Sequence, residues 1–324
     1  MNEKGTDVLQ QYDLDIIRTS RVRGAVLCET RQGCRLLKEY RGSEARLCQV
    51  ENALSALEGV SGIAVDRVIP NREGQLISVD ADQTAYIVKE WNSGRECDLT
   101  NEGEVLRGVR LLAMLHTGLR QVFGDECKEG NNLKEEYERR TAGLRRTRSY
   151  VRRVRNKSEF ELCMMRSFSM FFEQAEEALR QLELEEAGGT KPQKYLCHGE
   201  YSHHHILYDG EFAMITDFLG MLRGVQAGDL YYFMRKAMEK RGFCCRTGER
   251  ILEEYDRYLP LTKEERHYLY IRFLYPEKYW KQINYYYNSN KAWIPQRNTD
   301  KLKILEEQEP ERKKFLDFLH RSVI

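Results

Sequence analysis

The first 92 residues carry apolar positions in short, strand-like runs. Such runs surround Gln32-Gly33, where a hairpin turn is expected. Further strands are expected near 63–70, 75–79 and 85–91. One helix interrupts them, because Ser43 can cap a segment that runs to about Leu57 with leucines and a valine at helical spacing. This region is therefore predicted to be β-rich with a single helix.

Beyond a break at 92–94 the apolar spacing becomes mainly helical. Helices are predicted over 103–119, 133–157 and 160–184. The segment 195–218 is typical of two short strands joined by loops, and from Leu230 onward helical stretches are expected to alternate with tyrosine-rich turns. The order of elements predicts an α+β protein with two lobes, residues 1–92 and residues 93–324, the second carrying the β-loop segment 197–218.

Composition narrows the class of protein. Lysine and arginine total 52 against 51 aspartates and glutamates, a balance that argues against a binder of nucleic acid over its whole surface. No apolar run approaches the roughly 18 residues that would span a bilayer, and the first residues lack the apolar core of a signal peptide. The nine cysteines show no pairs at zinc spacing, so free thiols in a reducing compartment are expected.

The segment 197–207, CHGEYSHHHIL, followed by Ile215-Thr216-Asp217-Phe218, resembles the catalytic loop of the aminoglycoside phosphotransferase and choline kinase branch of the kinase superfamily. That branch has the pattern H-G-D-x-x-x-x-N-[IV]-L and then a strand ending in I-D-[FW]. Asp229-Leu230 is similar to the family's Asp-Leu at the start of the next helix. The resemblance implies a two-lobed, protein kinase-like fold.

Within that branch the chain is most similar to the CotS family of spore coat proteins. The similarity extends over nearly the whole chain, and the matching segments are 38–44 (KEYRGSE), 90–97, 111–116, 275–280 (YPEKYW), 286–288 and 293–295. The resemblance implies synthesis in the mother-cell cytoplasm, deposition on the spore coat and other coat proteins as partners. No membrane partner is expected, because no apolar run is long enough to span a bilayer, and nucleic acid is not expected either.

The resemblance also assigns roles to particular residues. An active kinase holds the nucleotide phosphates with a strand lysine that a helix carboxylate orients. Lys38 matches the lysine and Glu51 is the candidate carboxylate, while Asp217 matches the metal-binding aspartate. His198 matches a histidine that braces the catalytic loop through hydrogen bonds.

Three positions depart from the family's pattern. Glu200 replaces the catalytic aspartate and reaches about 1.5 Å further, and a misplacement of about 1 Å can cost on the order of a hundredfold in rate. His205 replaces the metal-binding asparagine, although magnesium prefers oxygen ligands. Leu36 shares the face of Lys38 where kinases keep a small alanine beside the adenine. These changes predict a degenerate site.

Two further features have competing interpretations. The triplet His203-His204-His205 could suggest a zinc or nickel site, but adjacent residues on a loop seldom converge on one ion. The basic run 139–157 is typical of a solvated helix face, with an acidic protein surface as the alternative ligand.

The leading hypothesis is a structural or assembly protein of the spore coat on a degenerate kinase-like scaffold, with no cofactor. The alternative is an ATP-dependent phosphotransferase that acts on an alcohol group, in which Lys38 and Asp217 hold Mg-ATP and Glu200 positions the acceptor. A third hypothesis is a module that senses nucleotide without turnover. Thermal stabilisation by Mg-ATP separates the binding hypotheses from the structural one.

Overall fold

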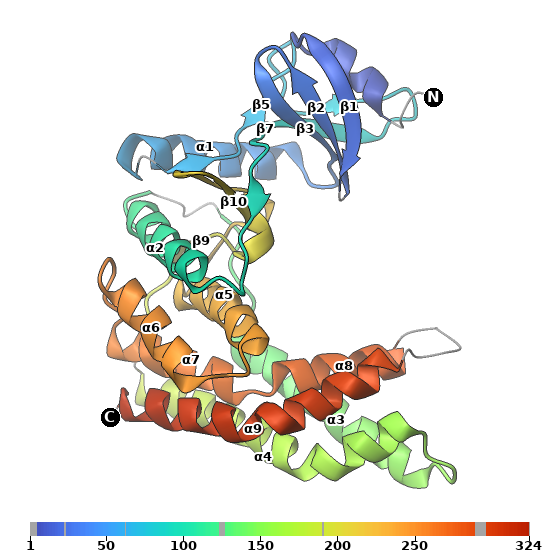
Figure 1. Ribbon diagram of the computed structural model, residues 1–324, viewed down its shortest axis with the longest axis vertical. Helices are drawn as coiled ribbons and strands as arrows, with labels where there is room; N and C mark the ends of the chain where they lie inside the picture. The colour runs from blue at the N-terminus through green and yellow to red at the C-terminus, as the bar shows by residue number, and fades with distance from the viewer. Residues whose placement is uncertain are drawn as a thin grey trace. The chain divides into compact units, whose positions relative to one another are not determined.

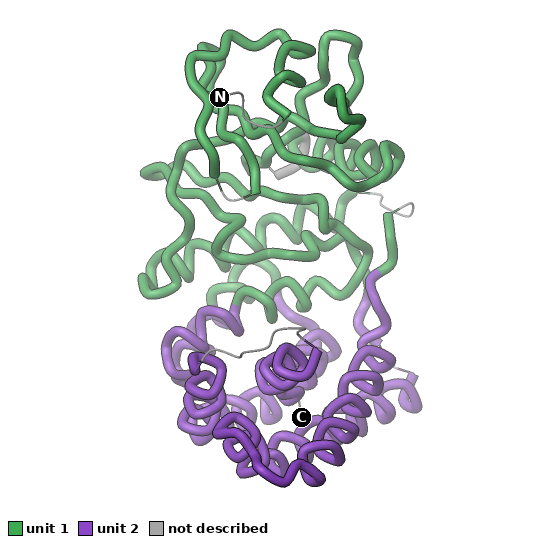
Figure 2. Tube along the Cα trace, turned by 90° about the vertical axis from the view of Figure 1, so that its right-hand side faces the viewer, with its two compact units in different colours: residues 1–129, 194–233, 254–259 green, residues 130–193, 234–253, 260–324 purple. Residues whose placement is uncertain are grey.

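The computed structural model describes residues 5–22, 24–61, 63–122, 127–189, 191–288 and 296–323. The chain divides into two compact units, shown in different colours in Figure 2. The first comprises residues 1–129, 194–233 and 254–259, and the second comprises 130–193, 234–253 and 260–324. The predicted lobe boundary at residue 92 lies inside the first unit and stays a prediction. Of the segments that carry the family resemblance, 293–295 lies outside the described residues.

The first unit begins with an antiparallel sheet whose strand order is β1-β2-β3-β7-β5, with β6 also paired to β7 (Figure 1). The hairpin expected at Gln32-Gly33 joins β2 to β3, and Thr30 pairs with Gly33 across it. The bounds of the strands are β1 Ile16–Val22, β2 Ala25–Thr30, β3 Gly33–Glu39, β5 Val68–Ile69, β6 Ser78–Val79 and β7 Ala85–Glu90.

The two faces of this sheet have different neighbours, because side chains alternate along each strand. Leu37 of β3 and Val88 of β7 belong to a buried cluster with Val8 and Leu9 of the short helix η1 (Thr6–Gln11). On the other face, Ile87 packs with Leu47 of helix α1 (Glu44–Ser61). The face with α1 also carries Lys38, which lies opposite Ile87 in the register.

Helix α1 confirms the helix predicted between the strands. Its first turn is capped by Ser43, whose hydroxyl oxygen accepts a hydrogen bond from the Arg46 amide at 3.2 Å. Leu47, Val50, Leu54 and Leu57 are all buried, as their helical spacing predicted. The helix ends four residues later than expected.

The rest of the first unit surrounds a second, four-stranded sheet of order β4-β11-β10-β8 and a two-stranded pair, β12 and β9. Strand β11 pairs in parallel with β4, and β10 pairs antiparallel with both β11 and β8. The bounds are β4 Ala64–Val65, β8 Arg95–Glu96, helix α2 Glu102–Leu119, β9 Tyr195–Cys197, η2 His203–His205, β10 Ile206–Asp209, β11 Phe212–Ile215, η3 Phe218–Gly220 and β12 Leu222–Gly224.

The second unit is helical. Phe171 of α4 stacks on Tyr279 of α8, with ring centroids 4.4 Å apart, and the Tyr279 hydroxyl donates to the Met164 carbonyl at 2.8 Å. These rings belong to a buried cluster that also includes Leu302 of α9. The helices are α3 Leu133–Arg153, α4 Glu159–Gly188, α5 Ala227–Lys240, α6 Cys245–Asp256, α7 Lys263–Leu274, α8 Glu277–Asn288 and α9 Arg297–Arg321; α5 and α6 each continue into the first unit.

Two predicted boundaries need correction. The helix predicted to reach Lys157 ends at Arg153, because Val154 is extended and Ser158 forms a capping box that starts α4. Most tyrosines expected in turns instead lie within helices, above all α7 and α8; Tyr258 does lie in a turn after α6, and Tyr275 directly follows α7. They pack as helix faces: Phe160 stacks on Tyr286 at 4.1 Å. The turn prediction was wrong for these tyrosines because their rings pack between helices.

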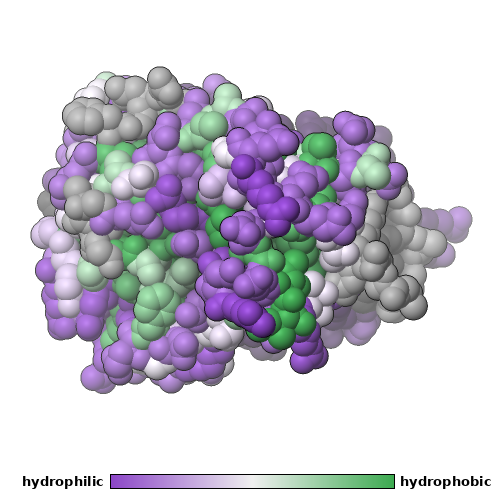
Figure 3. All heavy atoms as spheres, turned by 90° about the horizontal axis from the view of Figure 1, so that it is seen from above, coloured by the Kyte–Doolittle hydropathy of each residue, from purple (hydrophilic) through white to green (hydrophobic). Residues whose placement is uncertain are grey.

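Hydrophilic residues dominate the view in Figure 3, and hydrophobic residues show in patches between them.

Ile17 on the edge strand β1 is 67% exposed and Ile16 beside it is 40% exposed. Arg18 and Arg21 are exposed on the same strand, and charged side chains are a common protection of a sheet edge against pairing with other chains. None of the described helices has the length and apolar character needed to cross a membrane.

Candidate active site

Asp217 occupies a fixed position at the end of β11. Because β11 runs parallel to β4, the residues that follow both strands meet at one edge of the sheet. The Asp217 amide donates to both carboxylate oxygens of Asp66, each at 3.0 Å. Asp217 has φ 65° and ψ 56°, a left-handed conformation that is uncommon outside glycine. The Asp66 carboxylate therefore holds the backbone of Asp217 in a conformation that it would not prefer alone.

Asp66 is itself one half of a buried ion pair. Lys89 Nζ lies 2.5 Å from Asp66 Oδ2, and the two side chains are only 3% and 1% exposed. Lys89 sits on β7 directly opposite Leu36 on β3, so both residues share the face of the sheet that carries Lys38. A buried lysine and a buried leucine, itself 7% exposed, thus occupy the positions next to Lys38 on this face.

Lys38 and Asp217 are brought together. Lys38 Nζ donates to Asp217 Oδ2 at 2.9 Å, and both side chains are partly exposed. Burial would raise the pKa of Asp217, but the Lys38 ammonium outweighs this effect, so the pKa of the carboxyl lies below its ordinary value. The Asp217 carboxylate is therefore ionised and is paired with the Lys38 ammonium group.

Glu51, the predicted partner of Lys38, is bound elsewhere. Its Oε2 accepts from Arg67 Nε at 2.7 Å, and its Oε1 accepts from the Val68 amide at 3.1 Å. Among the described residues, the acidic partner of Lys38 is Asp217. The structure therefore places Glu51 on α1 as predicted, but with Arg67 and not with the lysine.

The loop between β9 and η2 is braced from within. His198 is fully buried; its Nε2 lies 3.0 Å from the Thr216 carbonyl oxygen and its Nδ1 accepts from the Glu200 amide at 3.2 Å. Asp229 accepts from the amides of His198 and Gly199 at 2.7 and 3.0 Å. These bonds hold the loop on both sides of His198.

Burial lowers the pKa of His198 to about 4, more than the Asp229 charge can offset, so the ring is neutral. Because this value lies below the ordinary 6.5, the unfolded chain binds more protons between the two values. The free energy of unfolding therefore keeps its full contribution from the neutral His198 ring above about pH 6.5. It loses that contribution, about 3 kcal/mol in all, as the pH falls toward 4.

A His198→Gln variant should show a smaller loss of unfolding free energy than the wild type between pH 7 and pH 4.5. Urea unfolding at both pH values measures the difference between the two proteins. Equal losses in the two proteins would contradict a buried, neutral His198.

His205, one of the positions that depart from the kinase pattern, lies next to Asp217. His205 Nδ1 donates to the Glu200 carbonyl oxygen at 2.8 Å, and its Nε2 lies 3.8 Å from Asp217 Oδ2. The Glu200 side chain is exposed and rests against Gly220. His204 is turned to another partner, with its Nδ1 2.5 Å from Glu96 Oε2. His204 and His205 thus face different partners.

The donor set does not suit the two-magnesium arrangement of a kinase. That arrangement needs oxygen ligands from an aspartate and an asparagine. Here an imidazole stands in the asparagine's position, and the aspartate is bound to Lys38. No cluster of three or more metal-binding side chains occurs among the described residues.

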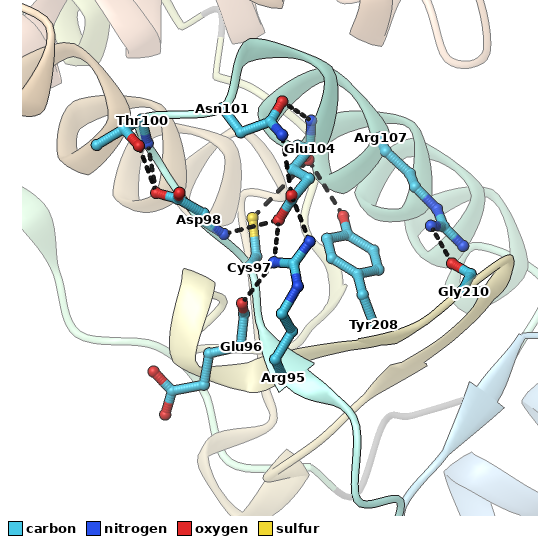
Figure 4. Close-up of polar contacts among 10 residues, drawn as sticks. All are labelled: Arg95, Glu96, Cys97, Asp98, Thr100, Asn101, Glu104, Arg107, Tyr208 and Gly210. Atoms are coloured by element: carbon cyan, nitrogen blue, oxygen red, sulfur yellow. Dashed lines mark hydrogen bonds and ion pairs between the residues drawn. The ribbon is translucent and has the colours of Figure 1, made fainter.

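The segment after β7 is anchored by a network of polar contacts, drawn in Figure 4. Arg95 of β8 binds Glu104 of α2 through two hydrogen bonds of 2.7 and 2.6 Å, and Glu104 also accepts from the Asp98 amide at 2.9 Å. Arg107 donates to the Gly210 carbonyl at 2.9 Å. This network ties β8 and the β10–β11 turn to the beginning of α2.

Asp66 and Lys89 were not predicted as site residues, although the sequence contains a signal. Each is a charged residue within an apolar, strand-like run, in IAVDRVI and AYIVKEW. Opposite charges inside two buried strands must find each other or remain unpaired at high cost.

The antiparallel sheet with its helix, the braced loop and the Lys38–Asp217 contact define a protein of the kinase-like class. Solved structures agree on the fold. An aminoglycoside phosphotransferase from Alicyclobacillus acidocaldarius is similar over 100% of this chain and 97% of its own, with a TM-score of 0.86 and 18% identity. The chain belongs to the family described as "Spore coat putative kinase YutH", whose pattern matches residues 6–319.

Two more distant structures share the fold. A microcompartment-associated aminopropanol kinase is similar over 97% of both chains, with a TM-score of 0.63 and 15% identity. The amicoumacin kinase hAmiN, solved with AMP-PNP, Ca²⁺ and Ami, has a TM-score of 0.63 and 12% identity over 96% of this chain and 94% of its own. No curated protein matches the chain. The predicted two-lobed kinase-like fold and the resemblance to CotS-type spore coat proteins are confirmed.

Proposed function

We propose that this protein is a structural or assembly component of the bacterial spore coat, built on a kinase-like scaffold that has lost efficient phosphoryl transfer. The family supports the spore coat as its place of action. We further propose synthesis in the mother-cell cytoplasm and other coat proteins as partners.

One observation supports the loss of activity: in the described part of the chain Lys38 is bound to Asp217, and the candidate helix carboxylate, Glu51, is bound to Arg67. A kinase needs its lysine oriented by a helix glutamate and its aspartate free to bind magnesium, both at once. In this chain one contact removes both conditions. The buried Leu36 and Lys89 next to Lys38 further reduce the room for a flat base.

A phosphotransferase remains the competing function, favoured by the exposed Glu200 carboxylate on a loop that His198 and Asp229 hold in place. In that case Glu200 would orient the acceptor hydroxyl, and Lys38 and Asp217 would separate to hold the phosphates and the metal.

The melting temperature of the purified protein with and without millimolar Mg-ATP separates the two functions. We expect no change, because a ligand stabilises only a protein that binds it. A rise of several degrees that Lys38→Ala abolishes would overturn the proposal.

The double variant Glu200→Asp/His205→Asn is the matched comparison, because it restores the two family residues without touching Lys38 or Asp217. If the substitutions at 200 and 205 alone silenced the site, only the double variant would respond to Mg-ATP. We expect a weak response or none, because Glu51 remains bound to Arg67.

A further inference from the structure

Three helices of the second unit bring a group of charged side chains together. The part of α5 in this unit, the last turns of α7 and the first two turns of α8 supply them. We call this group the basic cluster. Its members are the cations Arg235, Lys236, Arg272, Lys278 and Lys281 and the carboxylates Glu239 and Glu277.

Both carboxylates are fully engaged by cations of the cluster. Glu239 binds Arg235 through one oxygen and Lys278 through the other, the latter at 3.1 Å. Glu277 has Lys281 Nζ at 2.5 Å on Oε1 and Arg272 Nη2 at 4.0 Å from Oε2. Although burial alone would raise it, these cations bring the pKa of Glu277 to about 2.

Among the described residues, Lys236 is the cation of the cluster that has no carboxylate to itself. Its side chain is half-buried, and the carboxylate near it is Glu239, which Arg235 and Lys278 already share. Burial lowers the pKa of Lys236, and repulsion from Arg235, Lys281 and Lys278 lowers it further. A half-buried ammonium among other cations lacks the compensation that such groups ordinarily have.

On the described parts of α3 and α9, two nearby carboxylates are already paired with arginines. The charge of Glu136 on α3 acts on Tyr275, which directly follows α7. Glu136 is, however, paired with Arg140 on its own helix. Arg312 of α9 donates to the carbonyl groups of Phe273 and Leu274 and is paired with Glu309. Each of these two pairs is neutral. As defined among the described residues, the cluster holds five cations and two carboxylates.

We propose that the basic cluster is a binding site for an oxyanion of the phosphate class. A phosphate group carries about two negative charges near pH 7 and accepts several hydrogen bonds at once, so it fits a lysine surrounded by other donors better than a single carboxylate does. The site lies within the second unit, and the proposal does not depend on whether the first unit binds a nucleotide.

The test compares melting temperatures of the full chain in sodium phosphate and in sodium chloride at equal ionic strength and pH 7.5. The wild type should melt several degrees higher in phosphate, and Lys236→Met should lose that rise. In chloride, Lys236→Met should melt at the same temperature as the wild type or above it, because the variant removes an uncompensated charge. Lys236→Gln, which keeps a polar end group, should lose the rise as well.

Two controls make the result specific. Lys313→Met removes an exposed lysine of α9 and should keep the full phosphate rise. Lys38→Met should also keep it, which separates the basic cluster from the candidate active site. The proposal is overturned if the wild type shows no rise, or if Lys236→Met and Lys236→Gln retain it.

A second arm identifies the source of the phosphate group. O-phosphoserine at the same concentration, with serine as its control, presents the group as a monoester. A rise with inorganic phosphate alone assigns a site for the free ion, and a larger rise with O-phosphoserine assigns a phosphoryl group on a larger molecule. Either result supports the proposal when Lys236→Met abolishes it.

Discussion

Replacing Asp66 by asparagine is expected to lower the free energy of unfolding by about 3–5 kcal/mol. The substitution leaves the Lys89 ammonium buried without its counter-charge, while the amide oxygen can still accept from the Asp217 backbone. The loss therefore reports the ion pair and not the missing hydrogen bond. Urea unfolding of the purified variant at pH 7 measures it.

A double variant tests the reason for the loss. Asp66→Asn/Lys89→Met removes both charges, and buried pairs replaced as a unit are often neutral in stability, so most of the loss should be recovered. The surface pair of Arg41 and Glu39 is the matched control, with side chains 85% and 44% exposed. Glu39→Gln should cost at most about 1 kcal/mol. A double variant as unstable as Asp66→Asn would contradict the buried-pair explanation.

The ion pair also bears on the proposed loss of kinase activity. The Asp66 carboxylate accepts hydrogen bonds from the Asp217 amide, and the Lys38 ammonium group neutralises the Asp217 carboxylate. Two lysines and two aspartates thus balance one another within the first unit. The Lys38–Asp217 pair is the contact on which the proposed loss of activity rests.

Much of the fold could be predicted from the sequence because its apolar spacing is regular. Leu47, Val50, Leu54 and Leu57 are all buried on α1, as their spacing indicated. The same reasoning did not work for the tyrosines of α7 and α8, which were expected in turns. An aromatic residue suits a turn, a strand or a helical core equally well. Only packing partners such as Phe160 and Phe171 decide between these environments.

The candidate site was predictable only where a motif carried it. Lys38 and Asp217 came from the family resemblance, and the structure joins them. Glu51 was the candidate partner of Lys38, but in the structure it binds Arg67 and the Val68 amide, in the segment that runs from β4 into β5. The position of that segment beside α1 cannot be read from the spacing of apolar residues. Asp66 was not predicted as a site residue because the parallel pairing of β4 with β11 joins segments about 150 residues apart. The spacing of apolar residues along the chain does not encode such a pairing.

Replacing Gly199 by alanine is expected to destabilise the protein strongly, by about 2–5 kcal/mol when left-handed strain and overpacking are added. Gly199 has φ +86°, and a Cβ at this position would overlap the carbonyl oxygen of Gly220, which is backbone and cannot turn aside. The amide of Gly199 is also bound to Asp229, so the loop cannot shift without losing that bond. Gly210→Ala is the control, because Gly210 has φ +55° with nothing within 4 Å of the added carbon. It should cost only about 1–2 kcal/mol. Thermal unfolding of both variants gives the comparison, and equal losses would mean that the close approach of Gly199 to Gly220 does not constrain the loop.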